Sequence, residues 1–493
     1  MARSLMIWGT SSGAGKSLLC TALCRWAAQR GVDVAPYKAQ NMSNNARVVP
    51  GLDGGFGEIG AAQYFQALAA RVAPTVDMNP VLLKPESDVR SQVVLQGRVA
   101  AELAGMPWRE RSAVLAQSAA QSFARLAQRH EVIVIEGAGS PAEINLASAD
   151  YVNLDTARWA AAAGSLASLL VTDIDRGGAF AHLYGTWALL PDDLRPSLQG
   201  FVLNKFRGDA VLLSPGPALL QARSGVPMLG VLPMRRDHGL PDEDGVFEAA
   251  AADHGDGPGL HVAIVAWPHI SNLDEFQPLR QVPGLRLSWA RDAASLAAAD
   301  WIVLPGSKQV SGDLAWLRQR GMDQAVQRHA QAGKPVLGIC GGLQALGQWL
   351  DDPQGADGQA GSRAGLGLLP LHTRYASPKR VLPVQARFGE LGSPWSALSG
   401  LGLPAYEIRN GVTNPAPDAQ ARVVLFDAHG QPIGWQQGSV LGVYAHGLFE
   451  APALLKALFG QSVRTLDESL DGLAALVDEH FEPGVLACLF DRT

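Results

Sequence analysis

The sequence predicts an α/β protein of two large domains, the first of which contains a parallel sheet. From residue 5 to about residue 235, short β-branched runs alternate with longer helical patterns rich in Ala, Leu and Gln, and this alternation is typical of parallel sheets. A second α/β series starts at residue 260. Over residues 248–259 the periodicity is lost and Gly, Asp and Pro accumulate, which indicates an interdomain connection.

These observations divide the chain into four segments. We expect an N-terminal domain over residues 1–247, a linker over 248–259, a C-terminal domain over 260–455 and a helical segment over 456–493. A chain of 493 residues is too long for one ordinary hydrophobic core, so its length agrees with two large domains.

The composition indicates a globular, mildly acidic protein. Hydrophobic residues make up 47% of the chain, charged residues make up 17%, and the net charge is -6. This balance argues against a nucleic-acid partner, although a local phosphate site needs few basic side chains. No apolar run approaches the roughly 20 residues that a membrane helix requires, and no signal-peptide pattern precedes the first strand. We therefore expect no membrane partner.

The four cysteines, Cys20, Cys24, Cys340 and Cys488, show neither a metal-binding nor a disulfide spacing. Cys20 and Cys24 have helical spacing and are expected to be core thiols. This cysteine usage fits a reducing cytoplasm.

Strands are expected in both domains. In the N-terminal domain the clearest ones lie at residues 5–8, 32–36, 132–135, 169–171, 200–203 and 230–232. In the C-terminal domain they lie at 261–266, 301–304 and 335–339, and later β-rich stretches lie near 381–388 and 440–444. The Gly- and Asp-rich residues 351–365 are expected to form an irregular surface loop.

A glycine-rich loop joins the first strand to a helix. Residues 9–17 read Gly-Thr-Ser-Ser-Gly-Ala-Gly-Lys-Ser, and an amphipathic helix pattern follows. Backbone N–H groups around Gly13 and Gly15, together with the helix N-terminus, can surround a polyphosphate, and Lys16 can neutralise its β- and γ-oxygens. The Ser17 hydroxyl is a suitable ligand for Mg²⁺. The loop therefore predicts a site for ATP and Mg²⁺.

The loop departs from the usual spacing, because Thr10 stands where the first glycine is expected and Gly9 lies one residue earlier. This shift resembles the loop of dethiobiotin synthetase and its relatives, in which ATP activates a carboxylate. On that resemblance, Lys38 corresponds to a second lysine that faces the phosphates, although an exposed lysine after a strand is also ordinary. Glu136 follows the strand at 132–135, at the edge where open α/β sheets bind ligands. We expect it to bind Mg²⁺, the alternative being a solvated loop acid.

A second chemical motif centres on Cys340. The apolar residues 335–339 end at this cysteine, Gly341 and Gly342 follow it, and a helical pattern resumes. The arrangement predicts a nucleophile elbow, which is a strained strand-to-helix turn that presents its central side chain. We expect the Cys340 thiol to be a nucleophile.

A catalytic thiol that attacks an amide needs a base, usually histidine, which also protonates the leaving ammonia. His446 is the candidate because it follows the strand at 440–444 and precedes a glycine. A single histidine is more often a surface or core residue, so this assignment depends on its pairing with Cys340. We expect backbone N–H groups at Gly306 and Gly341 to bind the oxyanion.

The acid that supports the histidine is left open. Class I glutamine amidotransferases with a full triad place this acid two residues after the histidine, where the chain has Leu448. Glu450 lies four residues after His446, and we do not assign it this role.

Several motifs together resemble the cobyric acid synthase family over most of the chain. They lie at residues 38–43, 78–85, 136–146, 173–178 and 204–209 and in the Cys340 elbow. The resemblance implies a P-loop, dethiobiotin-synthetase-like domain followed by a class I glutamine amidotransferase domain of flavodoxin-like fold. It also places Asn204 at the nucleotide site. Two positions depart from the family's pattern, since Arg409 stands where histidine is expected and Asp357 lies near an expected glutamate.

The resemblance implies ATP- and glutamine-dependent amidation of the b, d, e and g carboxylates of adenosylcobyrinic acid a,c-diamide, a step of cobalamin biosynthesis. The substrates would be a corrinoid, ATP and glutamine, with ammonia released from glutamine at Cys340. The order of amidations, the ammonia route, the corrinoid contacts and the oligomeric state, a homodimer included, are left open.

Two alternatives are retained. Cobyrinic acid a,c-diamide synthase shares both domains but uses an earlier intermediate. Only the residues present in the motifs favour the later step. Alternatively, the N-terminal half is a partitioning-type ATPase switch joined to an inactive amidotransferase module. The presence of both Cys340 and His446 argues against that second alternative.

Overall fold

The computed structural model describes residues 2–87, 90–235, 238–241, 259–416, 419 and 421–490. The chain forms two compact units. Unit 1 comprises Met1–Ser43, Val49–Glu243 and Leu466–Thr493, and unit 2 comprises Asn44–Val48 and Asp244–Thr465. Apart from Gly259, the linker expected over 248–259 lies outside the described residues.

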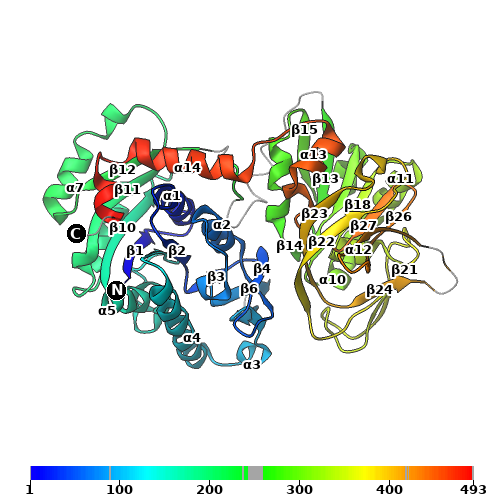
Figure 1. Cartoon of the computed structure of the whole chain (residues 1–493), viewed down its shortest axis with the longest axis horizontal. Coiled ribbons are helices and arrows are strands. Elements are labelled where there is room, and N and C mark those ends of the chain that lie inside the picture. The colour runs from blue at the N-terminus through cyan, green and yellow to red at the C-terminus, as the bar shows by residue number, and fades with distance from the viewer. Residues whose placement is uncertain are drawn as a thin grey trace. The chain divides into compact units, whose positions relative to one another are not determined.

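Unit 1 contains the parallel sheet that the sequence predicts (Figure 1). Along β1, Leu5 and Ile7 belong to one apolar cluster, whereas Met6 and Trp8 belong to another. Successive side chains of a strand point to opposite faces, so the sheet is buried on both sides. In spatial order its strands are β12 (Met228–Pro233), β11 (Leu198–Phe206), β10 (Ser165–Asp173), β1 (Arg3–Gly9), β9 (Val132–Glu136) and β2 (Val34–Tyr37).

Helices pack on this sheet, and α1 (Lys16–Gln29) follows β1 directly after the glycine-rich loop. Cys20 and Cys24 lie on the buried side of α1 in the same apolar cluster as Leu5, as expected for core thiols. The other helices before the C-terminal segment are α2 (Ala61–Ala69), α3 (Ala101–Ala104), α4 (Trp108–Arg129), α5 (Thr156–Ala163), α6 (Ala179–Leu189) and α7 (Gly216–Ser224). The smaller strands of unit 1 are β3 (Gln40–Met42), β5 (Phe56–Gly60), β6 (Val81–Ser87), β7 (Arg90–Leu95) and β8 (Arg98–Val99). Strand β4 (Ala46–Pro50) begins within Asn44–Val48, which belongs to unit 2.

The C-terminal segment returns to unit 1. Helix α14 (Leu466–His480) lies beside α1, as the red and dark blue helices of Figure 1 show, and α15 (Val485–Phe490) follows it. The buried Arg25 side chain of α1 pairs with Asp467 and Asp471 at 2.9 Å and 2.7 Å. Trp26 donates its indole N–H to Asp478 at 2.6 Å. The helical pattern was visible in the sequence, but these partners are more than four hundred positions away along the chain.

Unit 2 contains a nine-stranded mixed sheet. The strands from β15 to β27 are parallel, and those from β27 to β23 are antiparallel. Strand β18, in the interior of this sheet, ends immediately before Cys340. In spatial order the strands are β15 (Leu285–Ala290), β13 (Leu260–Val265), β16 (Trp301–Leu304), β18 (Val336–Ile339), β27 (Val440–Val443), β26 (Pro432–Gln437), β25 (Arg422–Phe426), β22 (Arg380–Phe388) and β23 (Gly402–Arg409).

The sequence prediction for residues 351–365 is wrong at both ends. Strand β19 (Trp349–Asp352) pairs antiparallel with β20 (Gly361–Ala364), within a small sheet that also holds β21 (Leu371–Arg374) and β24 (Val412–Pro415). Three of the four β20 residues are exposed, so this strand lacks the apolar alternation from which strands are recognised.

The remaining helices of unit 2 are α9 (Ala293–Ala297), α10 (Val310–Gln319), α11 (Met322–Gln331), α12 (Gly341–Leu346) and α13 (Pro452–Phe459). Two short strands, β14 (Ile270–Ser271) and β17 (Gly306–Ser307), pair antiparallel. The 3-10 segments η7 (Leu273–Gln281) and η9 (Leu448–Glu450) lie near the thiol site. Among the described residues, no helix combines the length and the apolar character that a membrane crossing needs.

Candidate active sites

The glycine-rich loop has the left-handed backbone that glycine permits. Gly13 has φ 71° and Gly15 has φ 99°, values at which other residues are strained. A Cβ atom on Gly15 would lie 1.8 Å from the Asn204 amide nitrogen, and that nitrogen donates to the Ala14 carbonyl at 3.0 Å. The predicted residue Asn204 therefore supports the loop backbone from strand β11. The resulting turn, followed by the N-terminus of α1, has the geometry of an anion cradle.

The Lys16 side chain folds back onto the same loop. Its ammonium group donates to the carbonyl oxygens of Ser11 at 2.9 Å and Gly139 at 3.0 Å, and the residue is only 4% exposed. Gly139 belongs to the turn that follows β9, so the lysine connects the loop to the adjacent strand end. This position holds a positive charge at the cradle, where it can neutralise phosphate oxygens.

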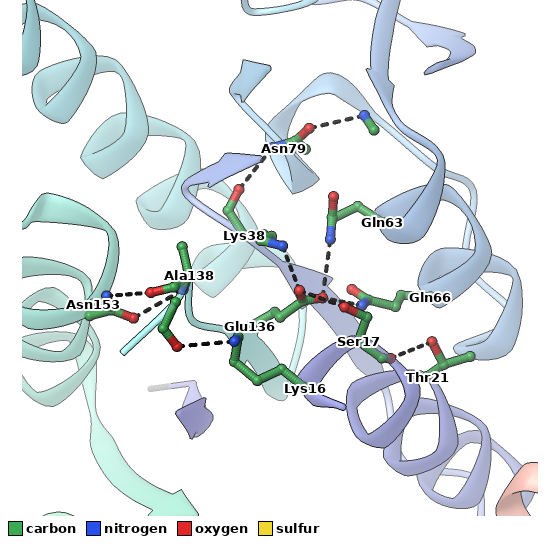
Figure 2. Close-up of polar contacts among 12 residues, drawn as sticks. Lys16, Ser17, Thr21, Lys38, Gln63, Gln66, Asn79, Glu136, Ala138 and Asn153 are labelled. Atoms are coloured by element: carbon green, nitrogen blue, oxygen red, sulfur yellow. Dashed lines mark hydrogen bonds and ion pairs between the residues drawn. The ribbon is translucent and has the colours of Figure 1, made fainter. Parts of the chain in front are cut away.

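Glu136 is the centre of a buried polar cluster at the end of β9 (Figure 2). Its Oε1 atom accepts from the Ser17 hydroxyl at 2.8 Å and from the Lys38 ammonium at 2.5 Å. Its Oε2 atom accepts from the amides of Gln63 at 3.2 Å and Gln66 at 2.5 Å. The structure thus brings together Ser17, Lys38 and Glu136, which the sequence had singled out separately. Charge-assisted hydrogen bonds of this kind hold a carboxylate in one orientation.

The two glutamines were missed by the sequence analysis. Gln63 and Gln66 lie three positions apart on α2 and therefore face the same side of that helix. No motif marked these two residues. The hydrophobic pattern of α2 shows that one face of the helix is buried, but it does not show that Gln63 and Gln66 contact the Glu136 carboxylate.

The donor set around Ser17 fits Mg²⁺. The Ser17 and Glu136 oxygens are 2.8 Å apart, and hydroxyl and carboxylate oxygens are ligands that Mg²⁺ accepts alongside substrate phosphates and water. The described residues contain no group of three or more His, Cys, Asp and Glu side chains that could hold a metal alone. An ion at this position would therefore take the rest of its coordination from phosphate oxygens and water.

A further basic side chain reaches the loop from strand β11. Lys205 donates to the Gly13 carbonyl at 2.8 Å and pairs with Asp173 at 3.0 Å. Asp173 and Asn204 are direct neighbours on the paired strands β10 and β11, which explains how two distant polar motifs meet at one edge of the sheet. Lys205 lies within the motif at residues 204–209, of which only Asn204 was expected at the nucleotide site.

In unit 2, Cys340 occupies a strained turn between β18 and α12. Its φ of 52° and ψ of -102° are unusual for a residue with a side chain. A Cβ on Gly342 would lie 1.9 Å from the Leu304 carbonyl oxygen, so only glycine permits this close approach of the helix start to strand β16. The geometry is that of the elbow predicted from the sequence.

His446 faces Cys340 and a buried acid. The Cys340 side chain raises the pKa of the ring through its charge and a hydrogen bond, and the Nδ1 atom of the ring lies 3.1 Å from Oε1 of Glu275. The second oxygen of Glu275 accepts the backbone N–H of Gly447 at 3.1 Å. Both side chains of the ion pair are at most 1% exposed. The carboxylate can thus fix the orientation of the imidazole while the other ring edge serves the thiol.

The surroundings of His446 favour its protonated form. Burial alone lowers the pKa of this histidine, but the charges of Glu275 and Cys340 and its hydrogen bonds to both outweigh burial and raise the pKa to about 10. At neutral pH the imidazolium is therefore the favoured state, ready to donate a proton.

Glu275 was not predicted, because 171 positions separate it from His446 and no local pattern marks it. Glu450, the nearby acid that the sequence offered, instead pairs with Arg47. Burial raises the pKa of Glu450 to about 7. The acid of the thiol site thus comes from the start of η7 rather than from the residues after His446.

The two glycines expected at the oxyanion site also lie beside this group. A Cβ on Gly306 would be 3.2 Å from the His446 ring carbon Cε1, and one on Gly341 would be 2.6 Å from the Ser307 nitrogen. Gly306 therefore lies beside the His446 ring, and the turn at Gly341 packs against the backbone of Ser307. Their function as oxyanion donors stays a prediction.

The two departures from the family pattern have structural partners. Arg409 pairs with Glu407, and its guanidinium lies 4.0 Å from the centre of the Tyr444 ring. Asp357 accepts the backbone N–H groups of Val310 and Ser311 at 2.8 Å each and so caps helix α10. Burial raises the pKa of Asp357 to about 6.

Comparison with known proteins covers both units. Residues 5–245 match a family model described as the CobQ/CobB/MinD/ParA nucleotide binding domain, and residues 261–454 match the CobB/CobQ-like glutamine amidotransferase domain. The chain is 59% identical to a cobyric acid synthase of Methylibium petroleiphilum, covering 98% of this chain and 96% of the relative. Cobyric acid synthases of Leptothrix cholodnii and a Polaromonas species are 58% and 56% identical, each covering 99% of this chain and 97% and 98% of the relative, respectively.

Proposed function

The chain belongs to the cobyric acid synthase family, and from this we propose that it amidates the b, d, e and g carboxylates of adenosylcobyrinic acid a,c-diamide. The reaction uses ATP and glutamine and gives adenosylcobyric acid. The proposal is supported above all by the group Cys340, His446 and Glu275, since one chain joins this apparatus for releasing ammonia to a nucleotide-binding domain.

The glutamine half of the reaction uses the thiol site. The Cys340 thiolate attacks the side-chain carbonyl carbon of glutamine, and N–H groups near Gly306 and Gly341 bind the oxyanion. As the C–N bond breaks, the His446 imidazolium gives its proton to the nitrogen, and ammonia leaves. The γ-glutamyl thioester is then hydrolysed by water, from which neutral His446 takes a proton. Glu275 holds the ring and stabilises its charged state throughout.

The synthetase half uses the loop of unit 1. A corrinoid carboxylate oxygen attacks the γ-phosphorus of ATP, ADP leaves, and an acyl phosphate forms. Lys16, Lys38 and Lys205 supply positive charge near the phosphates. Mg²⁺, when bound, neutralises charge between phosphate oxygens, and Ser17 and Glu136 are the residues that would hold it.

Ammonia then attacks the acyl carbon, and inorganic phosphate leaves with formation of the amide. Ammonia is mostly protonated in neutral water and the ammonium ion has no free electron pair, so release from glutamine into a protected path favours the attack. The nucleophilic thiol must stay reduced, which fits the cytoplasm.

The test is amidation by the full-length protein with ATP, Mg²⁺ and glutamine, comparing adenosylcobyrinic acid a,c-diamide with cobyrinic acid. We expect the a,c-diamide to be preferred, with glutamate, ADP and phosphate formed together with amide. Preference for cobyrinic acid would instead identify an a,c-diamide synthase. ATP hydrolysis without consumption of glutamine would support the partitioning-type switch.

A further inference from the structure

A short piece of the N-terminal half belongs to the glutaminase unit. Asn44–Val48 groups with unit 2, although the residues before and after it belong to unit 1. The Asn45 side-chain oxygen accepts the Leu273 backbone N–H at 2.8 Å. The Ala46 N–H donates to the Asn272 side-chain oxygen at 3.2 Å. These bonds fasten the segment to the turn that opens η7.

That turn positions the acid of the thiol site. Asn272 has a left-handed backbone with φ 55°, and Glu275 follows three positions later on η7 and is fully buried. The first N–H groups of a helix lack partners within the helix. Asn45 supplies one for Leu273, so the segment from the N-terminal half stabilises the start of the element that carries Glu275.

Arg47 is the centre of this contact. It is 1% exposed, and its guanidinium pairs with Asp274 and Glu450 and donates to the Tyr406 hydroxyl. The same guanidinium lies 5.0 Å from the centre of the Tyr406 ring. A planar guanidinium can satisfy several acceptors at once, which the ammonium of lysine cannot do in the same geometry.

Tyr406 connects Arg47 to the catalytic histidine. The Tyr406 and His446 rings are stacked, with centres 5.3 Å apart and an angle of 19° between their planes. Their backbones exchange hydrogen bonds as well, at 2.9 Å and 3.3 Å. The position of one ring therefore constrains the other.

Arg47 also compensates negative charge near His446. Three carboxylates, Asp274, Glu275 and Glu450, lie close to one another, and burial raises the pKa of Asp274. Glu275 is paired with the histidine, whereas Arg47 pairs with the other two. A buried acid such as Asp274 is costly without a cation and would take up a proton or shift.

We propose that Arg47 is a positioning residue of the glutaminase, which holds Tyr406 against His446 and compensates the two acids beside Glu275. This inference rests on the proposed function of Cys340. It implies that glutamine hydrolysis depends on a residue contributed by the N-terminal half of the chain, a short distance after Lys38 in the sequence.

The test compares Arg47→Met and Arg47→Lys with the unaltered full-length chain. We expect Arg47→Met to lower kcat for glutamine hydrolysis about 10- to 100-fold, the range found when a catalytic group is slightly misplaced, with a smaller change in KM. The pH profile of Cys340 alkylation by iodoacetamide should also shift, because it reports the state of the thiol and imidazole. Arg47→Lys should restore the profile in part by keeping the charge.

Two controls separate positioning from general damage. Arg25→Met removes another buried arginine with two acidic partners, but in unit 1, and should leave glutamine kcat unchanged. Ammonia-dependent amidation by Arg47→Met should persist, which shows a folded synthetase site. Tyr406→Phe keeps the ring beside His446 but removes the hydroxyl that accepts from Arg47, and we expect an effect smaller than that of Arg47→Met.

The inference is overturned if Arg47→Met hydrolyses glutamine with unchanged kcat and an unchanged alkylation profile. It is also overturned if Arg25→Met lowers glutamine kcat as much as Arg47→Met does. Failure of the unaltered chain to amidate the a,c-diamide would contradict the proposed substrate instead, since glutamine hydrolysis is measured without the corrinoid.

Discussion

Glu275 and His446 form a buried ion pair, with Oε1 of the acid 3.1 Å from Nδ1 of the ring. The acid also accepts the N–H of Gly447, the next residue in the chain. It therefore holds both the side chain and the following backbone of the histidine. This contact completes the proposed arrangement of nucleophile, base and orienting acid, in which the acid comes from a remote part of the sequence.

The role of Glu275 can be tested by Glu275→Gln, with Glu450→Gln as the comparison. The substituted side chain would keep the shape of Glu275 but lose the charge that stabilises the imidazolium. We therefore expect kcat for hydrolysis of the substrate glutamine to fall about 10²- to 10⁴-fold. Glu450 has no hydrogen bond to His446 and its side chain is 35% exposed, so its substitution should cost much less. Steady-state glutaminase assays measure both, and equal losses would contradict the assignment.

The pH dependence follows from the raised pKa of His446. Its folded-state pKa of about 10 exceeds the ordinary value of 6.5. Stability from the charged imidazolium is therefore fully present below pH 6.5 and is lost as the pH rises through about 10. We expect the alkaline limb of glutamine kcat/KM to follow the same loss, because the proton donor disappears. In Glu275→Gln this alkaline limb should move to lower pH. Alkaline limbs at the same pH in the variant and in the unaltered chain would count against the ion pair.

Separation of the two half-reactions is tested by Cys340→Ala. Without the thiol, no thioester can form, so glutamine-dependent amidation should be abolished. Amidation supported by added ammonium salt should continue, because the loop of unit 1 is unchanged. Product analysis with each nitrogen source provides the measurement. Loss of both activities would argue against separate sites.

The reciprocal variant is Glu136→Gln. It removes the charge that gathers Ser17, Lys38 and two glutamines, so we expect ammonia-dependent amidation to fall at least about 100-fold. Basal glutamine hydrolysis should be retained. When Mg²⁺ is titrated, the rate of the residual reaction should respond less to Mg²⁺ at low concentration than the rate of the unaltered chain does. An unaltered Mg²⁺ response would contradict Glu136 as a Mg²⁺ ligand.

The packing of α14 makes a stability prediction. Leu473 is 1% exposed and belongs to the apolar cluster that contains α1 and β1 residues, so Leu473→Ala should destabilise unit 1 by about 2–5 kcal/mol. Leu219 is 57% exposed, and Leu219→Ala should change stability by less than about 0.5 kcal/mol. Thermal unfolding distinguishes the two variants, with the unfolding of unit 1 identified as the transition whose midpoint ATP shifts. Similar midpoints for both variants would show that α14 adds little.

The local sequence was sufficient for the elements whose chemistry depends on neighbours in the chain. Strand β1, the loop ending at Lys16 and the turn at Cys340 each combine an apolar run, glycines and a reactive residue within a few positions. Backbone conformation at such turns is set by local sterics, because glycine tolerates close approaches and positive φ values that strain other residues. The parallel sheet of unit 1 was also predictable, from alternation alone.

Only the tertiary structure decided which polar side chains meet. Gln63 and Gln66 reach Glu136 from α2, and Glu275 reaches His446 from η7. Arg47 lies in the segment Asn44–Val48, which joins a unit formed otherwise by Asp244–Thr465. Sequence periodicity reports which face of an element is buried, whereas partners across a core depend on how strands and helices are brought together. The sequence by itself determined the strained turn at Cys340 and the glycine-rich loop, and the folded chain determined which charged side chains surround them.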